Sequence, residues 1–142
     1  MFTPSQHDVR RFFCETFRKQ EAREILTPIE AIARDWVLQH PEYARALTDV
    51  DTALATDYSV EQGAANPFLH LSMHLSIAEQ VSIDQPPGIR AAHQALAHRL
   101  GSEHEAHHQI MECLGEMIWQ SQRSGLPPDG AAYIDCVSRR QK

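Results

Sequence analysis

Apolar side chains recur every three or four positions along most of this chain, and nowhere do they alternate for long enough to predict a strand. Capping residues and prolines divide the pattern into segments. Helices are predicted from residue 3 to at least residue 17 and at residues 27–40, 41–47, 66–83, 89–100, 102–123 and 129–139. The acidic, glycine-containing residues 48–65 are expected to be the least regular part, with at most a helical turn or two. The pattern predicts one all-α domain over residues 1–142, a compact helical bundle of about four main helices plus short helices.

Composition narrows the class of protein further. A length of 142 residues suits a single domain with one core. The formal net charge of −6 argues against nucleic acid or an anionic membrane surface as a partner. No apolar run is long enough to span a membrane, and the first residues carry no apolar signal region. We therefore expect a cytoplasmic protein.

The three cysteines also indicate a cytoplasmic protein. Cys14, Cys113 and Cys136 are odd in number, far apart and without a Cys-x-x-Cys pair. This pattern is typical of reduced thiols that fill small spaces in a core. We expect all three to be free, as is usual in the cytoplasm.

Two histidines stand out in the predicted helix 66–83. His70 and His74 are four residues apart, and at about 100° per residue both fall within the apolar arc of that helix. A buried polar group without a partner costs about 1–3 kcal/mol. Because one metal ion can bind two imidazoles at positions i and i+4, this spacing predicts a metal site.

The predicted helix 102–123 offers further ligands near its start. His104 and His108 are also spaced i and i+4. Glu105 and His108 have the Glu-x-x-His spacing found in di-iron carboxylate bundles. This segment is therefore a candidate to supply ligands from a second helix.

A competing pair lies about 100° around the same helix. Glu103 and His107 are spaced i and i+4 and lie near the centre of the main apolar arc. Trp119 lies on the arc of His108, and this large apolar side chain indicates that the arc of His108 is packed as well. Both pairs stay candidates on helical phase alone.

Residues 104–108 read His-Glu-Ala-His-His, which matches the HExxH motif of zinc proteases. That motif needs a third ligand well downstream, and no histidine follows His108. A small zinc hydrolase is therefore the less favoured alternative.

The other histidines are interpreted more simply. His7 and His98 fall on polar faces and are expected to be solvated. His40 lies on the apolar arc of its predicted helix, and His93 flanks the apolar face of its own. For both, the simplest interpretation is an imidazole at the core edge that hydrogen-bonds a backbone carbonyl. His40 also lies at the end of a predicted helix, where a cation is favourable.

The chain resembles a known bacterial family, domain of unknown function 1841. The resemblance covers nearly the whole chain and rests on Asn-Pro-Phe-Leu-His-Leu-Ser-Met-His at 66–74, Asp-Gln-Pro-Pro-Gly-Ile-Arg at 84–90, and residues 1–13, 40–43 and 104–123. It implies no activity, substrate or cofactor. The family pattern has histidine at the places of His70, His74, His104 and His108, but not reliably at that of His107. The resemblance therefore favours His104 and His108 over Glu103 and His107.

These observations favour a metal-binding helical bundle. We expect His70, His74, His104 and His108 to share a transition-metal site, with Glu105 or another acid as a further ligand. Iron, zinc, manganese or copper would suit this mixture of imidazole and carboxylate. Redox or O₂ chemistry follows only by analogy with hemerythrin and ferritin-like bundles.

The main alternative is a non-enzymatic structural or protein-interaction domain whose histidines form a buried hydrogen-bonded network. A metal ion is the one partner that the sequence predicts. Association into a homo-oligomer stays open.

Overall fold

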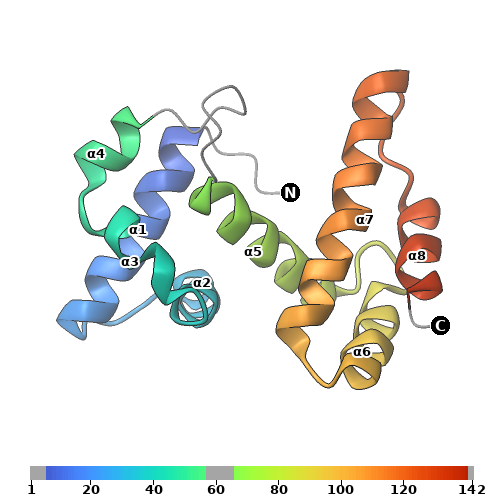
Figure 1. Ribbon diagram of the computed structural model, residues 1–142, viewed down its shortest axis with the longest axis horizontal. Coiled ribbons are helices and arrows are strands. Elements are labelled where there is room, and N and C mark those ends of the chain that lie inside the picture. Colours follow the sequence, from blue (N-terminus) through green and yellow to red (C-terminus); the bar gives the residue numbers. More distant parts are fainter. Residues whose placement is uncertain (1–5, 57–65, 141–142) are drawn as a thin grey trace. The chain divides into compact units, whose positions relative to one another are not determined.

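The computed structural model describes residues 6–56 and 66–140, and every regular element in these ranges is helical, which confirms the all-α prediction (Figure 1). The elements are α1 (Gln6–Ala22), α2 (Pro28–Leu38), the 3₁₀ helix η1 (Pro41–Tyr43), α3 (Ala44–Thr48), α4 (Val50–Ala55), α5 (Pro67–Ile83), α6 (Ile89–Leu100), α7 (Glu103–Ser124) and α8 (Gly130–Arg139). The chain divides into two units, Met1–Leu75 and Ser76–Lys142, with the division inside α5. The expectation of a single domain stays a prediction.

The longer predicted helices agree with α2, α5, α6, α7 and α8 to within two residues at each end. The described part of the segment 48–65 contains the short helix α4, and residues 57–65 lie outside the described ranges. The predicted helix start at residue 3 lies outside them too. Within the described parts of the chain, we find no helix with both the length and the apolar character needed to cross a membrane.

The core of the first unit forms around α1, which contacts α2, α3 and α4. Its buried side chains are Phe13, Cys14, Ala33, Trp36, Val37, Leu47, Ala53, Phe68, Leu71 and Leu75. The buried Arg10 donates from Nη1 to the carbonyl oxygens of Ala53 at 2.8 Å and Thr56 at 3.0 Å. A cation at the last carbonyls of α4 is favourable, so Arg10 ties α1 to the end of that helix.

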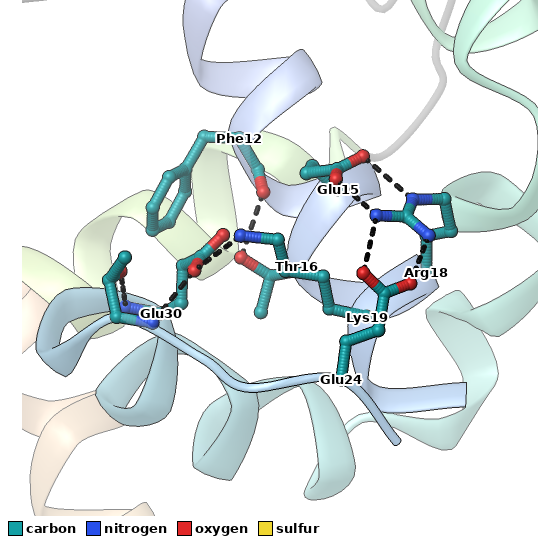
Figure 2. A network of polar contacts seen from close by, with 8 residues as sticks. Phe12, Glu15, Thr16, Arg18, Lys19, Glu24 and Glu30 are labelled. Carbon is teal, nitrogen blue, oxygen red and sulfur yellow. Dashed lines mark hydrogen bonds and ion pairs between the residues drawn. The ribbon is translucent and has the colours of Figure 1, made fainter. Parts of the chain in front are cut away.

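The start of α2 is fixed by a capping box. The Thr27 hydroxyl accepts from the backbone N–H of Glu30, and the Glu30 carboxylate accepts from the backbone N–H of Thr27 at 2.9 Å. Lys19 of α1 donates to the same carboxylate at 3.0 Å (Figure 2). The buried Glu30 therefore both caps α2 and holds it against α1.

The second unit packs α6, α7 and α8 against one another in pairs. Its core consists of Ile77, Ile89, Ala92, Leu96, Ala106, Ile110, Met111, Cys113, Leu114, Tyr133 and Val137. The Tyr133 hydroxyl donates to the side-chain oxygen of Gln80 at 2.6 Å. This bond joins α8 to the second half of α5.

The string 84–90 makes the turn between α5 and α6. The Asp84 carboxylate accepts from the backbone N–H groups of Gly88 at 3.2 Å and Arg90 at 3.0 Å. The Arg90 guanidinium donates to the carbonyl oxygens of Val81 at 3.0 Å and Ser82 at 2.7 Å. Gly88 has φ +101°, a conformation that other residues rarely adopt. The turn therefore satisfies carbonyls at the end of α5 that the helix itself leaves without donors.

The expectation of three free thiols is wrong for two of them. Cys113 of α7 and Cys136 of α8 form a disulfide, with their Cα atoms 5.8 Å apart, and only Cys14 is a free, buried cysteine. The sequence separation of 23 residues gives no hint of this proximity, which arises from the packing of α7 on α8. The cysteines therefore no longer support a cytoplasmic location.

The expectation that Trp119 is packed is also wrong. Its side chain is 49% exposed, and the Arg123 guanidinium lies over the indole ring, 5.0 Å from the ring centroid. The buried side chains of α7 follow the arc of His107 instead. Trp119 therefore gives no support for burial of the arc of His108.

Candidate metal centres

Three imidazoles of the first unit converge on one another. His40 follows α2, and His70 and His74 lie on the first half of α5. The Nε2 atom of His70 is 3.1 Å from Nε2 of His40 and 3.2 Å from Nε2 of His74. Two nitrogens bound at about 2.0–2.1 Å to one tetrahedral ion would lie about 3.3 Å apart. The observed spacings are therefore close to those of nitrogens that share an ion.

A backbone contact fixes the protonation of one ring. Nδ1 of His40 lies 2.7 Å from the carbonyl oxygen of Trp36. A carbonyl only accepts, so Nδ1 carries the proton, and Nε2 of the neutral ring presents a lone pair to His70. This confirms the expected bond from His40 to a backbone carbonyl.

The arrangement of the three Nε2 atoms limits the number of hydrogen bonds that the rings can form without a metal ion. Nε2 of His70 carries either one proton or one lone pair, yet it faces ring nitrogens of both His40 and His74. One hydrogen bond of good geometry can serve only one of these contacts. A cation between the rings would bind a lone pair from all three.

Aromatic neighbours hold two of these rings in place. The indole of Trp36 stacks on His74 with centroids 4.2 Å apart and planes 12° apart. Tyr43 stacks on His40 at 5.2 Å and 2°. His74 and His40 are buried, and His70 is half-buried. The surroundings thus restrict the orientation of the ring nitrogens.

The second unit brings together the other predicted histidine pair. The rings of His104 and His108 lie 4.4 Å apart at 70°, and both residues are half-buried. Glu105 is exposed, and its backbone N–H donates to the Ser102 hydroxyl at the helix start. Among the residues that the structure describes, its carboxylate does not belong to a close group of potential ligand atoms.

A second close group in this unit consists of His93 from α6 with Glu103 and His107 from α7. Their potential ligand atoms lie within 4.8 Å of one another. His93 and His107 are buried and Glu103 is exposed. The expected hydrogen bond from His93 to a carbonyl is absent, because neither ring nitrogen has a hydrogen-bond partner among the described residues.

Burial keeps these two imidazoles neutral. Burial, together with smaller contributions from the neighbouring His93, His104 and His108, lowers the pKa of His107 to about 3. Burial also lowers the pKa of His93, which the negative charge of Glu103 partly offsets. A neutral imidazole is the form that binds a metal ion.

Comparison with known protein families identifies the family of this chain. The sequence profile "Domain of unknown function (DUF1841)" matches residues 5–139. The chain belongs to the DUF1841 family. The match covers nearly the whole chain and confirms the resemblance inferred from its motifs. No curated protein and no solved structure matches the chain significantly.

For this DUF1841 chain, the predicted ligands are only partly brought together within the units described. His70 lies with His74, and His104 lies with His108. The prediction that both pairs share one ion with Glu105 joins residues of two units and stays a prediction. The sequence did not indicate His40 as a partner of His70, because its position on the apolar arc of α2 equally suits a core residue.

Proposed function

We propose that this protein binds a transition-metal ion through His40, His70 and His74. The observation that carries the proposal is the convergence of three Nε2 atoms, one of them with its lone pair directed by the bond from His40 to Trp36. Metal-binding histidines ordinarily donate their other ring N–H to a carbonyl or a carboxylate, which fixes the tautomer. His40 has this arrangement.

The donor set narrows the choice of metal. Imidazole nitrogens suit zinc, copper and iron, whereas manganese prefers oxygen ligands. Three protein ligands are also the number found in catalytic zinc sites, where water or substrate takes the fourth position. The proposal is therefore a site for zinc, copper or iron.

The alternative function is structural. In that case the imidazoles form a hydrogen-bonded core network, which the N···N distances of 3.1 and 3.2 Å also allow. The two functions differ in one property, the tight and saturable binding of a metal.

Metal analysis of untagged protein separates them. The chain is stripped with a chelator, reconstituted separately with zinc, copper, iron and manganese, desalted and analysed for bound metal. His70→Asn should lose one equivalent, because it removes the central nitrogen of the group. His98→Asn, at an exposed position of α6, is the matched control and should keep it.

Stability gives a second readout. An ion that binds only the folded chain adds about 2.7 kcal/mol at 100 times its dissociation constant, so melting should rise with metal concentration. A wild-type chain that retains none of the four metals, with no shift in melting, would establish the structural alternative.

A further inference from the structure

We propose that His93, Glu103 and His107 form a second site for a divalent transition-metal ion, made of different residues from the His40–His70–His74 group. The site lies wholly within the second unit. It therefore stands or fails independently of the function proposed above.

The helical hairpin of α6 and α7 creates this site. Gly101 and Ser102 alone connect the two helices, and Gly101 has φ +67° at the end of α6. The chain thus reverses tightly, and His93 on α6 meets His107 on the second turn of α7. Their rings lie 5.2 Å apart at 76°. Glu103, one turn before His107, contributes an oxygen within the same group.

The state of His93 is the observation that points to a ligand. The side chain is only 7% exposed, yet neither Nδ1 nor Nε2 has a hydrogen-bond partner among the described residues. Buried polar groups in folded proteins are nearly always satisfied by protein, water or an ion. A cation bound to one of the two His93 nitrogens would give that nitrogen a partner. The same cation would also be within reach of His107 and Glu103.

The chemistry of the donors fits a zinc-like ion. Two imidazoles and one carboxylate are the ligands of a well-known class of zinc sites, which leave a fourth position for water. The exposed Glu103 places the carboxylate at the solvent-facing edge, where an ion can enter. The two buried imidazoles form the inner part of the site.

The experiment uses Zn²⁺ as the probe and counts equivalents bound by the untagged, chelator-treated chain. Wild-type protein should bind one more equivalent than His93→Gln. Glu103→Gln should lower the affinity for that additional Zn²⁺ at least about tenfold, since loss of an outer-shell partner of a metal ligand already has an effect of this size. His98→Gln, on the exposed face of α6, is the control and should bind as wild type.

Co²⁺ absorption provides an independent measurement of the same site. The ligand-field bands of the chain should change in His93→Gln and Glu103→Gln but not in His98→Gln. If His93→Gln does not fold by circular dichroism, Glu103→Gln decides, because an exposed residue tolerates this change. Unchanged zinc stoichiometry, affinity and cobalt bands in a folded Glu103→Gln or His93→Gln chain would overturn the proposal.

The two metal proposals remain distinguishable in this series. Loss of one equivalent in His70→Asn alone supports only the site of the first unit. Loss in His93→Gln alone supports only the site of the second unit and overturns the first.

Discussion

Nδ1 of His40 donates a hydrogen bond to the carbonyl oxygen of Trp36, 2.7 Å away and one helical turn earlier. The indole of the same Trp36 stacks on His74. One residue therefore positions two of the three converging imidazoles, His40 through its backbone and His74 through its side chain. The geometry of the first candidate metal site depends on the packing of α2 as much as on its own ligands.

Truncation of Trp36 should destabilise the protein strongly. The side chain is 5% exposed, so Trp36→Ala should lower the free energy of unfolding by about 3–5 kcal/mol. Trp119→Ala is the matched control, and because that side chain is 49% exposed the loss should be clearly smaller than for Trp36→Ala. Urea denaturation measures both. Equal losses in the two variants would contradict the burial described for α2 and α7.

The disulfide should be visible as missing thiols. Oxidised protein unfolded in denaturant should react with one equivalent of a thiol reagent, at Cys14, and with three after reduction. In the folded protein Cys14 should react slowly, because burial raises its pKa to about 11. Three reactive thiols in unreduced protein would show that Cys113 and Cys136 are not bonded.

The same bond should contribute to stability. A loop closed across 23 residues restricts the unfolded chain by about 3 kcal/mol. The Cys113→Ser, Cys136→Ser double variant should therefore unfold at lower urea concentration than oxidised wild type. Reduced wild type is the control and should resemble the variant.

Acid should weaken the contact between α1 and α2. The Thr27 backbone N–H, together with Lys19, lowers the pKa of Glu30 below its ordinary value of 4.5. The carboxylate therefore stabilises the fold fully above that value, and the contribution is lost as the pH falls through the lowered folded pKa. Glu30→Gln keeps an oxygen that can accept from Thr27 but lacks the charge.

The measurement is the free energy of unfolding of both chains from pH 7 to pH 3. The stability advantage of wild type over Glu30→Gln should shrink as the solution becomes more acidic. Glu21→Gln, at an exposed position of α1, is the control. An advantage that stays constant over this range would contradict the assigned role of Glu30.

The turn between α5 and α6 should depend on Arg90. Arg90→Ala removes two bonds to the carbonyls of Val81 and Ser82, and we expect a loss of about 1 kcal/mol. Arg90→Lys should recover little, since an ammonium lacks the forked guanidinium geometry. Arg45→Ala, at an exposed position of α3, is the control. Thermal melting that does not separate the Arg90 and Arg45 variants would contradict this role.

Local signals account for what the sequence predicts well. The Thr27 cap, the Pro-Pro-Gly turn before α6 and Gly125 after α7 lie next to the residues they affect, so helix ends follow from short-range chemistry. The i, i+4 spacing of His70 and His74 likewise brings their rings within 4.8 Å. Each of these predictions needs only the geometry of one helix.

What the sequence does not predict depends on contacts between helices. His40 meets His70 across 30 residues, and Cys113 meets Cys136 across 23. Helical phase describes the face of one helix, but not which neighbour covers it. Trp119 illustrates this limit, because this apolar residue on a plausible packed arc is about half exposed.

The most direct test of the first metal site observes its nitrogens. Long-range ¹H–¹⁵N NMR spectra of the metal-free, untagged chain are recorded before and during addition of Zn²⁺, with the exposed His98 as an internal reference. We predict that Nε2 of His40, His70 and His74 shift together to values of metal-bound nitrogen, while Nδ1 of His40 keeps its proton. Imidazole spectra of these three residues that do not change at saturating Zn²⁺ would contradict the proposed site.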